Sequence, residues 1–147
     1  FTRGGGELAK VKEEKVPVPK VVVNGDMTSV EVAAVPHQLK FNLTNFSVKA
    51  GSKVKIKFFN PDVIPHNLLI VEPGSKAEIG NQAIAMGADA VKKAPENSKI
   101  LYGTKMLEAG QTEVIEFTAP ANPGDYEFVC TFPGHWTVMN GVMKVTK

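Results

Sequence analysis

Short segments of alternating apolar and polar residues run along much of the chain. The clearest is 53–58, in which Val54, Ile56 and Phe58 alternate with lysines. A period of two places one face of a strand on a core and leaves the other face in water. Clusters of Gly, Pro, Asn and Asp separate these segments, and many short strands joined by such turns predict an all-β sandwich. Three further strand candidates are 67–71, 114–117 and 126–130.

One segment has a helical period instead. Its apolar residues recur every three or four positions between 76 and 93: Ile79, Ala83, Met86 and Ala90. This spacing predicts a short helical insertion near 76–93. Gly80 and Gly87 weaken a helix, so we expect one short helix or two pieces. Met86 is interpreted as a packing residue of that insertion.

The first 20 residues show neither period. Three consecutive glycines at 4–6 are followed by mixed charges and a Val-Pro-Val-Pro sequence, a composition that favours an extended backbone. We therefore divide the chain into a flexible linker or N-terminal extension, residues 1–20, and one folded domain, residues 21–147. The extension is either a frayed terminus without a role or a tether to another domain.

Composition narrows the classes of function. Of the 147 residues 43% are hydrophobic, which fits a globular domain. The 17 basic and 15 acidic residues leave a net charge of +2, which provides no basic surface for nucleic acid. No segment approaches the ~18 apolar residues of a membrane-spanning helix. The single cysteine, Cys130, excludes an internal disulfide and a zinc site built on several thiolates.

The region 126–139 contains most of the candidate chemistry. Strand alternation places Cys130 on the inward face, together with Tyr126 and Phe128. The Pro-Gly pair three residues later stops the strand near this cysteine. A tight loop is then expected to return His135 toward the sulfur.

Three donor types converge from ten residues of this loop: the Cys130 thiolate, the His135 imidazole and the Met139 thioether. A second imidazole must come from elsewhere, and His66 is the best candidate because it stands at the head of the apolar segment 67–71. Two imidazoles, one thiolate and a weak axial thioether form the ligand set of a blue-copper electron-transfer site. The sequence therefore predicts such a site.

The same residues carry a family resemblance. The sequence Cys-Thr-Phe-Pro-Gly-His at 130–135, with Met139 four residues later, resembles the cupredoxins, or type 1 blue-copper proteins, and among them the azurins and auracyanins. Pro-His-Asn at 65–67 resembles the first-histidine motif of cupredoxins. The likeness spans about residues 30–147 and is absent from 1–20.

The resemblance implies a Greek-key β-sandwich of about eight strands with one copper ion at one end. Its ligands would be His66, Cys130, His135 and, axially, Met139. It further implies three supporting residues around the ligands. Asn67 would brace the two ligand loops, the backbone N–H groups of Asn67 and Phe132 would donate to the cysteine sulfur, and Pro65, where azurins carry Gly, would leave no close fifth ligand.

Electron carriers of this family imply redox partners such as cytochromes or a copper or haem enzyme. We expect a periplasmic or extracytoplasmic location, with the N-terminal linker as a tether. The outer ring edge of His135 is the expected exit point for the electron. A docking patch is expected around it, formed by four apolar residues: Ile64, Phe132, Pro133 and Trp136.

Other interpretations stay open at this point. Cys130 can be an inert core thiol, whereas a nucleophile would need exposure and a neighbouring base. A copper oxidase or nitrite reductase needs further histidines, and only His37, otherwise a loop residue, is left over. Copper storage would need a dense Met- or Cys-rich segment, but the methionines are scattered. The alternative to a free carrier is an electron-relay domain of a larger respiratory redox enzyme.

Overall fold

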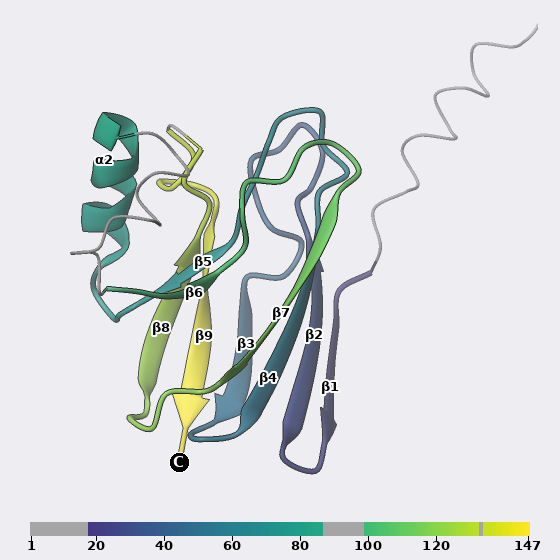
Figure 1. Cartoon of the computed structure of the whole chain (residues 1–147), viewed down its shortest axis with the longest axis vertical. Coiled ribbons are helices and arrows are strands. Elements are labelled where there is room, and N and C mark those ends of the chain that lie inside the picture. Colours follow the sequence, from purple (N-terminus) through teal and green to yellow (C-terminus); the bar gives the residue numbers. More distant parts are fainter. Residues whose placement is uncertain (1–17, 87–98, 133) are drawn as a thin grey trace, which may run out of the picture.

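Two sheets packed face to face form the body of the molecule (Figure 1). The computed structural model describes residues 18–86, 99–132 and 134–147, and within them the first sheet has the order β1-β2-β4-β7 and the second the order β3-β9-β8-β5-β6. The described strands are β1 (Lys20–Asn24), β2 (Met27–Ala33), β3 (Asn45–Lys49), β4 (Lys53–Phe59), β5 (Leu69–Val71), β6 (Ile100–Gly103), β7 (Thr112–Thr118), β8 (Gly124–Val129) and β9 (Asn140–Thr146). The predicted all-β sandwich is confirmed, with nine described strands where about eight were expected.

Strand β4 shows why the chain folds this way. Val54, Ile56 and Phe58 are fully buried between the sheets, and the alternating lysines are exposed. The strand pairs in parallel with β2 and antiparallel with β7. The period of two seen in the sequence is therefore the period of burial.

Aromatic rings fill the space between the sheets. Phe41 contacts Phe58 and Phe128 edge to face, with ring centroids 5.7 and 5.2 Å apart. The ring of Phe46 also contacts Phe128, with centroids 5.8 Å apart and the ring planes tilted by 37°. Such contacts bury large apolar areas in geometries that aromatic pairs favour, so this cluster supplies much of the stability of the body.

Helix α2 (Lys76–Met86) lies beside the second sheet, near one end of the sandwich (Figure 1). Ile79 and Ala83 form its buried face and pack with Val71 and Ile100 in a small second core. The predicted helix is thus confirmed for 76–86. The rest of the predicted insertion, Ala90 included, lies outside the described residues, as does the side chain of Met86.

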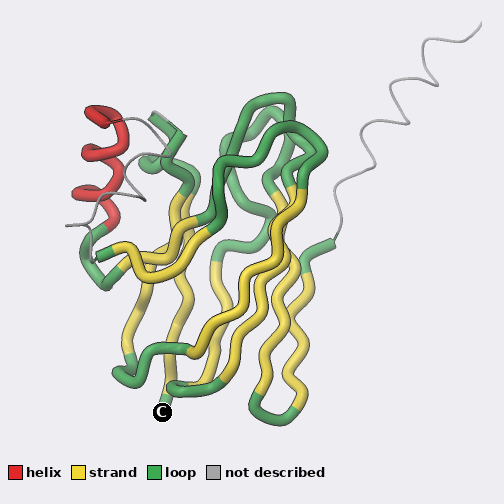
Figure 2. Tube along the Cα trace, in the orientation of Figure 1, coloured by secondary structure: helices red, strands yellow, loops and turns green. Residues whose placement is uncertain are grey.

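The longer connections between strands gather at one end of the sandwich (Figure 2). Strand β1 begins at Lys20, the last residue of the range predicted as a linker. Residues 1–17 of that range lie outside the described part, so the linker stays a prediction.

Candidate metal centre

Two loops carry the predicted donors at this end of the sandwich. The first follows β4, and Asn60 shapes it: its side-chain N–H groups donate to the carbonyl oxygens of Ile64 (3.0 Å) and Leu107 (2.9 Å). His66 follows this turn and exchanges two backbone hydrogen bonds with Leu107, at 3.1 and 2.8 Å. The loop thus delivers the His66 side chain from a fixed backbone.

The second loop joins β8 to β9 and begins where the sequence predicted the end of a strand, directly after Val129. Three backbone hydrogen bonds close it. The amide of His135 donates to Phe132 (2.9 Å), that of Met139 to His135 (2.7 Å), and that of Cys130 to Met139 (3.1 Å). The loop therefore folds back on itself and brings His135 and Met139 beside Cys130.

Asn67 joins the two loops. Its side-chain N–H donates to the hydroxyl of Thr131 at 2.8 Å, and its side-chain oxygen accepts the backbone N–H of Thr131, also at 2.8 Å. Both residues are buried, where hydrogen bonds are strong and costly to lose. This pair holds two segments that are 64 residues apart in sequence.

The loops place three donor atoms in one buried group. The Sγ atom of Cys130 lies 3.6 Å from Nδ1 of His66 and 3.6 Å from Nδ1 of His135. All three atoms lie within 4.8 Å of one another. Cys130 and His66 are fully buried, and His135 is 6% exposed. Among the described residues this is the group of His, Cys, Asp and Glu side chains that could hold a metal ion.

These distances fit a shared metal ion. A metal bonded to a thiolate at about 2.3 Å and to an imidazole at about 2.0 Å, at an angle of about 109° to 120°, holds the two donors about 3.5 to 3.7 Å apart. A thiol has one proton and can donate it to one of the two imidazoles. The sulfur can also accept an N–H from the other imidazole, so hydrogen bonds and one shared metal ion each account for the two equal 3.6 Å contacts. Sulfur and imidazole donors suit copper or zinc rather than calcium or magnesium.

Comparison with known proteins shows to which protein family the chain belongs. A model of the copper-binding proteins of the plastocyanin/azurin family matches residues 27–146. The chain belongs to this family. The resemblance to cupredoxins seen in the ligand motif is thereby confirmed.

Two auracyanins are among the similar proteins. The chain is 37% identical over 123 residues to auracyanin-B of Chloroflexus aurantiacus, covering 80% of this chain and 52% of that protein. It is 32% identical over 120 residues to auracyanin-A of the same organism, covering 80% and 74%. The solved structure of auracyanin A, a blue copper protein, superposes with a TM-score of 0.73 at 31% identity and covers 82% of this chain and 99% of the other. The chain thus spans about half the length of auracyanin-B.

Burial controls the protonation of the donors in this plastocyanin/azurin family member. It raises the pKa of the Cys130 thiol to about 11, although the backbone N–H groups of Asn67 and Phe132 donate to the sulfur and oppose the rise. These are the two donors that the family resemblance implied. Burial, and next the proximity of His66, lowers the pKa of His135. At neutral pH the imidazole of His135 is therefore available as a ligand, and a metal must displace the thiol proton.

The sequence interpretation missed a fourth polar residue at this cupredoxin centre. The carboxylate of Asp62 lies 2.9 Å from Nε2 of His66, and both side chains are fully buried. Burial raises the pKa of Asp62, but hydrogen bonds from His66 and from the backbones of Val63 and His37, together with the charge interaction with His66, outweigh it, so the pKa lies below its ordinary value. The one signal in the sequence is its place four residues before a candidate ligand.

The remaining predicted site residues differ in burial. Met139 is fully buried in the same core cluster as Cys130. The ring of Phe132 is half-buried, with its centroid 4.7 Å from that of His135. Ile64, Pro65 and Trp136 are half-buried, and Pro133 lies outside the described residues.

Trp136 packs on helix α2 at a glycine. A Cβ atom at Gly80 would lie 2.1 Å from Cγ of Trp136, so the indole occupies the space that a side chain would need. Gly80, interpreted from the sequence as a weakness of the helix, is the contact between α2 and the ligand loop. His37 is an exposed loop residue, as expected.

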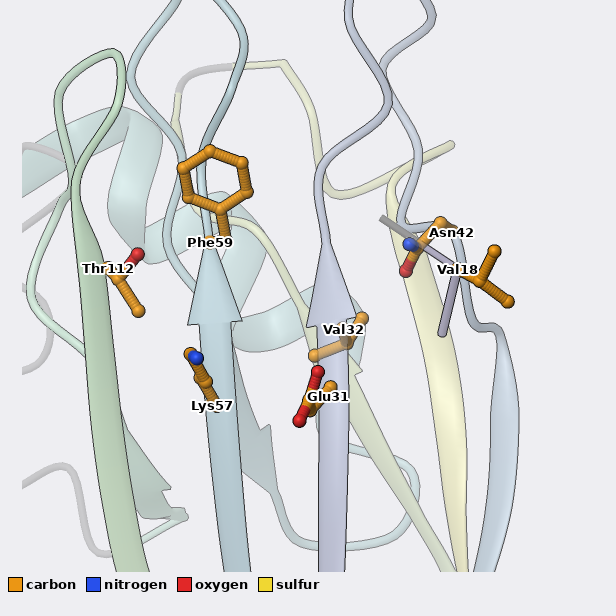
Figure 3. Close-up of a pocket in the computed structure, with 7 residues that line it drawn as sticks. All are labelled: Val18, Glu31, Val32, Asn42, Lys57, Phe59 and Thr112. Carbon is orange, nitrogen blue, oxygen red and sulfur yellow. The ribbon is translucent and has the colours of Figure 1, made fainter. Parts of the chain in front are cut away.

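Figure 3 shows a pocket beside the first sheet. Glu31 and Lys57, which face each other across β2 and β4, contribute to its walls. None of the candidate ligands lines it. Its lining residues are Val18, Glu31, Val32, Asn42, Lys57, Phe59 and Thr112.

Proposed function

We propose that this chain is a type 1 copper electron carrier, with one copper ion held by His66, Cys130 and His135 and, axially, by Met139. The observation that carries the proposal is the pair of equal 3.6 Å separations between the cysteine sulfur and the two imidazole nitrogens, inside a buried centre of a copper-binding family. When bound, copper supplies a one-electron couple between Cu(I) and Cu(II).

The chain's own contribution is a donor set that need not move. Asn67 and Thr131 lock the two loops together, and three backbone hydrogen bonds close the loop 130–139. A carrier exchanges electrons rapidly when its ligands keep the same positions in both oxidation states. The similar auracyanin A is a blue copper protein, and this hydrogen-bonded donor set supports an electron-carrier role for the present chain.

The proposed route to a partner passes through His135. It is the donor that reaches the surface, at 6% exposed, while His66 and Cys130 are fully buried. The half-buried Phe132 and Ile64 each lie two positions from a ligand in the chain. Two strongly exposed valines are close to the ligands in sequence: Val63 at 73%, three positions before His66, and Val138 at 58%, directly before Met139. Partners such as cytochromes or a copper or haem enzyme would need only a small apolar contact here, as transient redox encounters do.

Titration of the apoprotein with Cu(II), followed by visible absorption, tests the proposed function. One equivalent should produce an intense blue charge-transfer band, because a short thiolate–copper bond in a trigonal site gives this colour. Replacing Met139 with Leu should keep the band and raise the reduction potential, since loss of a weak axial donor favours Cu(I). A colourless copper-loaded protein would contradict the proposal. An unchanged reduction potential in the Met139→Leu variant would show that Met139 is not a ligand.

Electron self-exchange, measured by NMR line broadening of the copper-loaded protein, tests the docking surface without a known partner. Val138→Lys should slow self-exchange while leaving the blue band in place. Val22→Lys on β1, a valine of similar exposure at 54%, is the matched control and should not slow it. Equal rates in both variants would show that the electron leaves by another surface.

We also propose a periplasmic or extracytoplasmic location, where azurin-like carriers work. Within the described residues, no helix has the length and apolar character needed to cross a bilayer. Fractionation of cells that express the full gene product would locate the domain and reveal a tether. Recovery in the cytoplasm would contradict the proposal.

A further inference from the structure

Asp62 is a buried carboxylate in direct contact with a proposed copper ligand. Its Oδ2 atom lies 2.9 Å from Nε2 of His66, on the opposite side of the imidazole from the Nδ1 atom that faces Cys130. Burying a carboxylate is costly unless hydrogen bonds replace its water. Its hydrogen bonds to protein groups must therefore replace that water.

The surrounding backbone holds Asp62 in place. Its Oδ1 atom accepts the N–H of Val63 at 2.7 Å, and its own N–H donates to the side-chain oxygen of Asn60 at 2.9 Å. The backbone N–H of His37 also donates to the carboxylate. These contacts come from two separate loops, so the carboxylate is positioned independently of His66.

The loop that supplies the His37 N–H is strained. His37 has a φ of 65° and Leu39 a φ of 44°, in the left-handed region that residues other than glycine rarely adopt. Such strain persists where the surrounding structure enforces it, often at functional sites. Here it turns a backbone N–H toward the carboxylate that contacts His66.

The partners of Asp62 determine the proton position on His66. The backbone groups of Val63 and His37 are N–H donors, so the carboxylate acts as an acceptor toward them. An acceptor opposite Nε2 requires the His66 proton to be on Nε2. The lone pair is then on Nδ1, the atom 3.6 Å from the cysteine sulfur.

We propose that Asp62 is a positioning residue that fixes the tautomer and orientation of His66 and, through the Nε2 hydrogen bond, makes its imidazole a stronger donor to Cu(II). A carboxylate behind a ligating histidine raises the basicity of that ligand. A more basic imidazole stabilises Cu(II) more than Cu(I), so Asp62 lowers the reduction potential. This inference rests on the proposed copper site.

The first experiment compares two variants that each remove one negative charge. Asp62→Asn keeps the size of the side chain and removes the carboxylate. Glu108→Gln is the control, because Glu108 is exposed and directly follows Leu107, the backbone partner of His66, so the charge is lost from the same end of the molecule. The measurements are Cu(II) affinity by competition with a chelator and reduction potential by spectroelectrochemistry.

Asp62→Asn should lower Cu(II) affinity by about 10- to 100-fold, the usual loss when the partner of a ligating histidine is removed. For each tenfold loss of Cu(II) affinity at unchanged Cu(I) affinity, the reduction potential should rise by about 59 mV. Glu108→Gln should leave both quantities near the wild-type values. If both variants shift affinity and potential equally, Asp62 contributes only its charge, and the proposal is overturned.

A second measurement needs neither copper nor a variant. Long-range ¹H–¹⁵N correlation spectra of the wild-type apoprotein report the tautomer of each histidine. The His66 ring should carry its proton on Nε2, and a proton on Nδ1 would overturn the proposal. This result stands even where Asp62→Asn fails to fold. It also separates the two proposals, because a wild-type protein that binds no copper rejects the proposed function while its His66 tautomer is still measured.

Discussion

The body of the sandwich and its ligand end bury opposite kinds of side chain. In the body, β4 buries Val54, Ile56 and Phe58 and leaves its lysines in water. At the ligand end many of the fully buried side chains are instead polar, among them Asn60, Asp62, His66, Asn67 and Thr131. Polar groups stabilise a fold only when hydrogen bonds replace their water. The body therefore supplies stability, and the ligand end is organised for its chemistry at a cost in stability.

The backbone shows the same contrast. The β1–β2 turn in the body uses Gly25 at a φ of 65°, which a glycine adopts without strain. At the ligand end His37 adopts the same φ although it has a side chain. The body places a glycine where the backbone needs a positive φ, whereas the loop near the donors places a histidine there. Such departures from local sequence preference are expected near functional sites. Mutations at the ligand end should therefore mainly change the blue band, and mutations in the body should mainly lower the free energy of unfolding.

The largest effect on function is expected at Cys130. Cys130→Ala should abolish the blue band completely, because the thiolate supplies the charge transfer. The apoprotein should lose only about 1 kcal/mol in its free energy of unfolding, a typical value for a single substitution. Absorption of the copper-loaded variant and urea denaturation of the apoprotein check both statements. A residual blue band would show that another residue holds the copper.

The largest effect on stability is expected in the body. Phe58 is fully buried and contacts Phe41 edge to face. Phe58→Ala should lower the free energy of unfolding by about 3–5 kcal/mol, because it removes apolar contacts and leaves a cavity. Lys57→Ala, at the exposed neighbouring position, is the control and should change it by less than about 0.5 kcal/mol.

The blue band of Phe58→Ala shows whether the donor geometry is independent of packing in the body. The folded fraction of Phe58→Ala should keep the band of the wild-type protein, because the hydrogen bonds of the ligand loops do not involve Phe58. Loss of the band in a variant that is still folded would mean that the body sets the donor geometry directly.

Four strands could be predicted from the sequence by a local period or an apolar run: the segments 53–58, 67–71, 114–117 and 126–130 fall on β4, β5, β7 and β8. The other described strands were not named individually, and in β1 the residues Val21, Val22 and Val23 are consecutive and all exposed. Three apolar residues in a row give no period of two, so the strand-like pattern that begins at Val21 did not define the bounds of this strand. This strand forms because it pairs with β2, a partner that follows a tight turn.

The donor types at the ligand end could also be predicted, because three of them lie within ten residues of the sequence. The structure brings His66, Cys130 and His135 together, and their binding of copper stays a prediction. Asp62 could not be found this way. Carboxylates are almost always exposed unless they are paired, and one partner of the buried Asp62 is the His37 backbone, which lies 25 positions earlier.

A smaller effect is expected where the two regions meet, at Gly80. In an exposed helix Gly→Ala stabilises by about 0.5–1 kcal/mol. Here the added Cβ would lie 2.1 Å from the Trp136 ring, and forced displacement of a packed side chain costs about 1–3 kcal/mol. Gly80→Ala should therefore destabilise, whereas Asn81→Ala, at the next and exposed position, should not.

Fluorescence reports this displacement directly, because Trp136 is the only tryptophan in the sequence. Its emission should shift to longer wavelength in Gly80→Ala as the ring gains exposure, and should stay unchanged in Asn81→Ala. An unshifted emission together with wild-type stability would mean that α2 moves aside without disturbing the ligand loop.

The smallest effect is expected on the outer face of β4. Lys55 is exposed and faces the exposed Glu116 of β7 across the sheet. Lys55→Gln should change the free energy of unfolding by about 0.5 kcal/mol or less, since exposed charge pairs contribute little. It should also leave the reduction potential and self-exchange unchanged. Lys55 stands four residues before the end of β4, about 13 Å along the strand, and salt screens charges beyond about 8 Å at physiological ionic strength. A shift in potential as large as that expected for Asp62→Asn would mean that the charge of the whole molecule, rather than the hydrogen bond to His66, tunes the copper site.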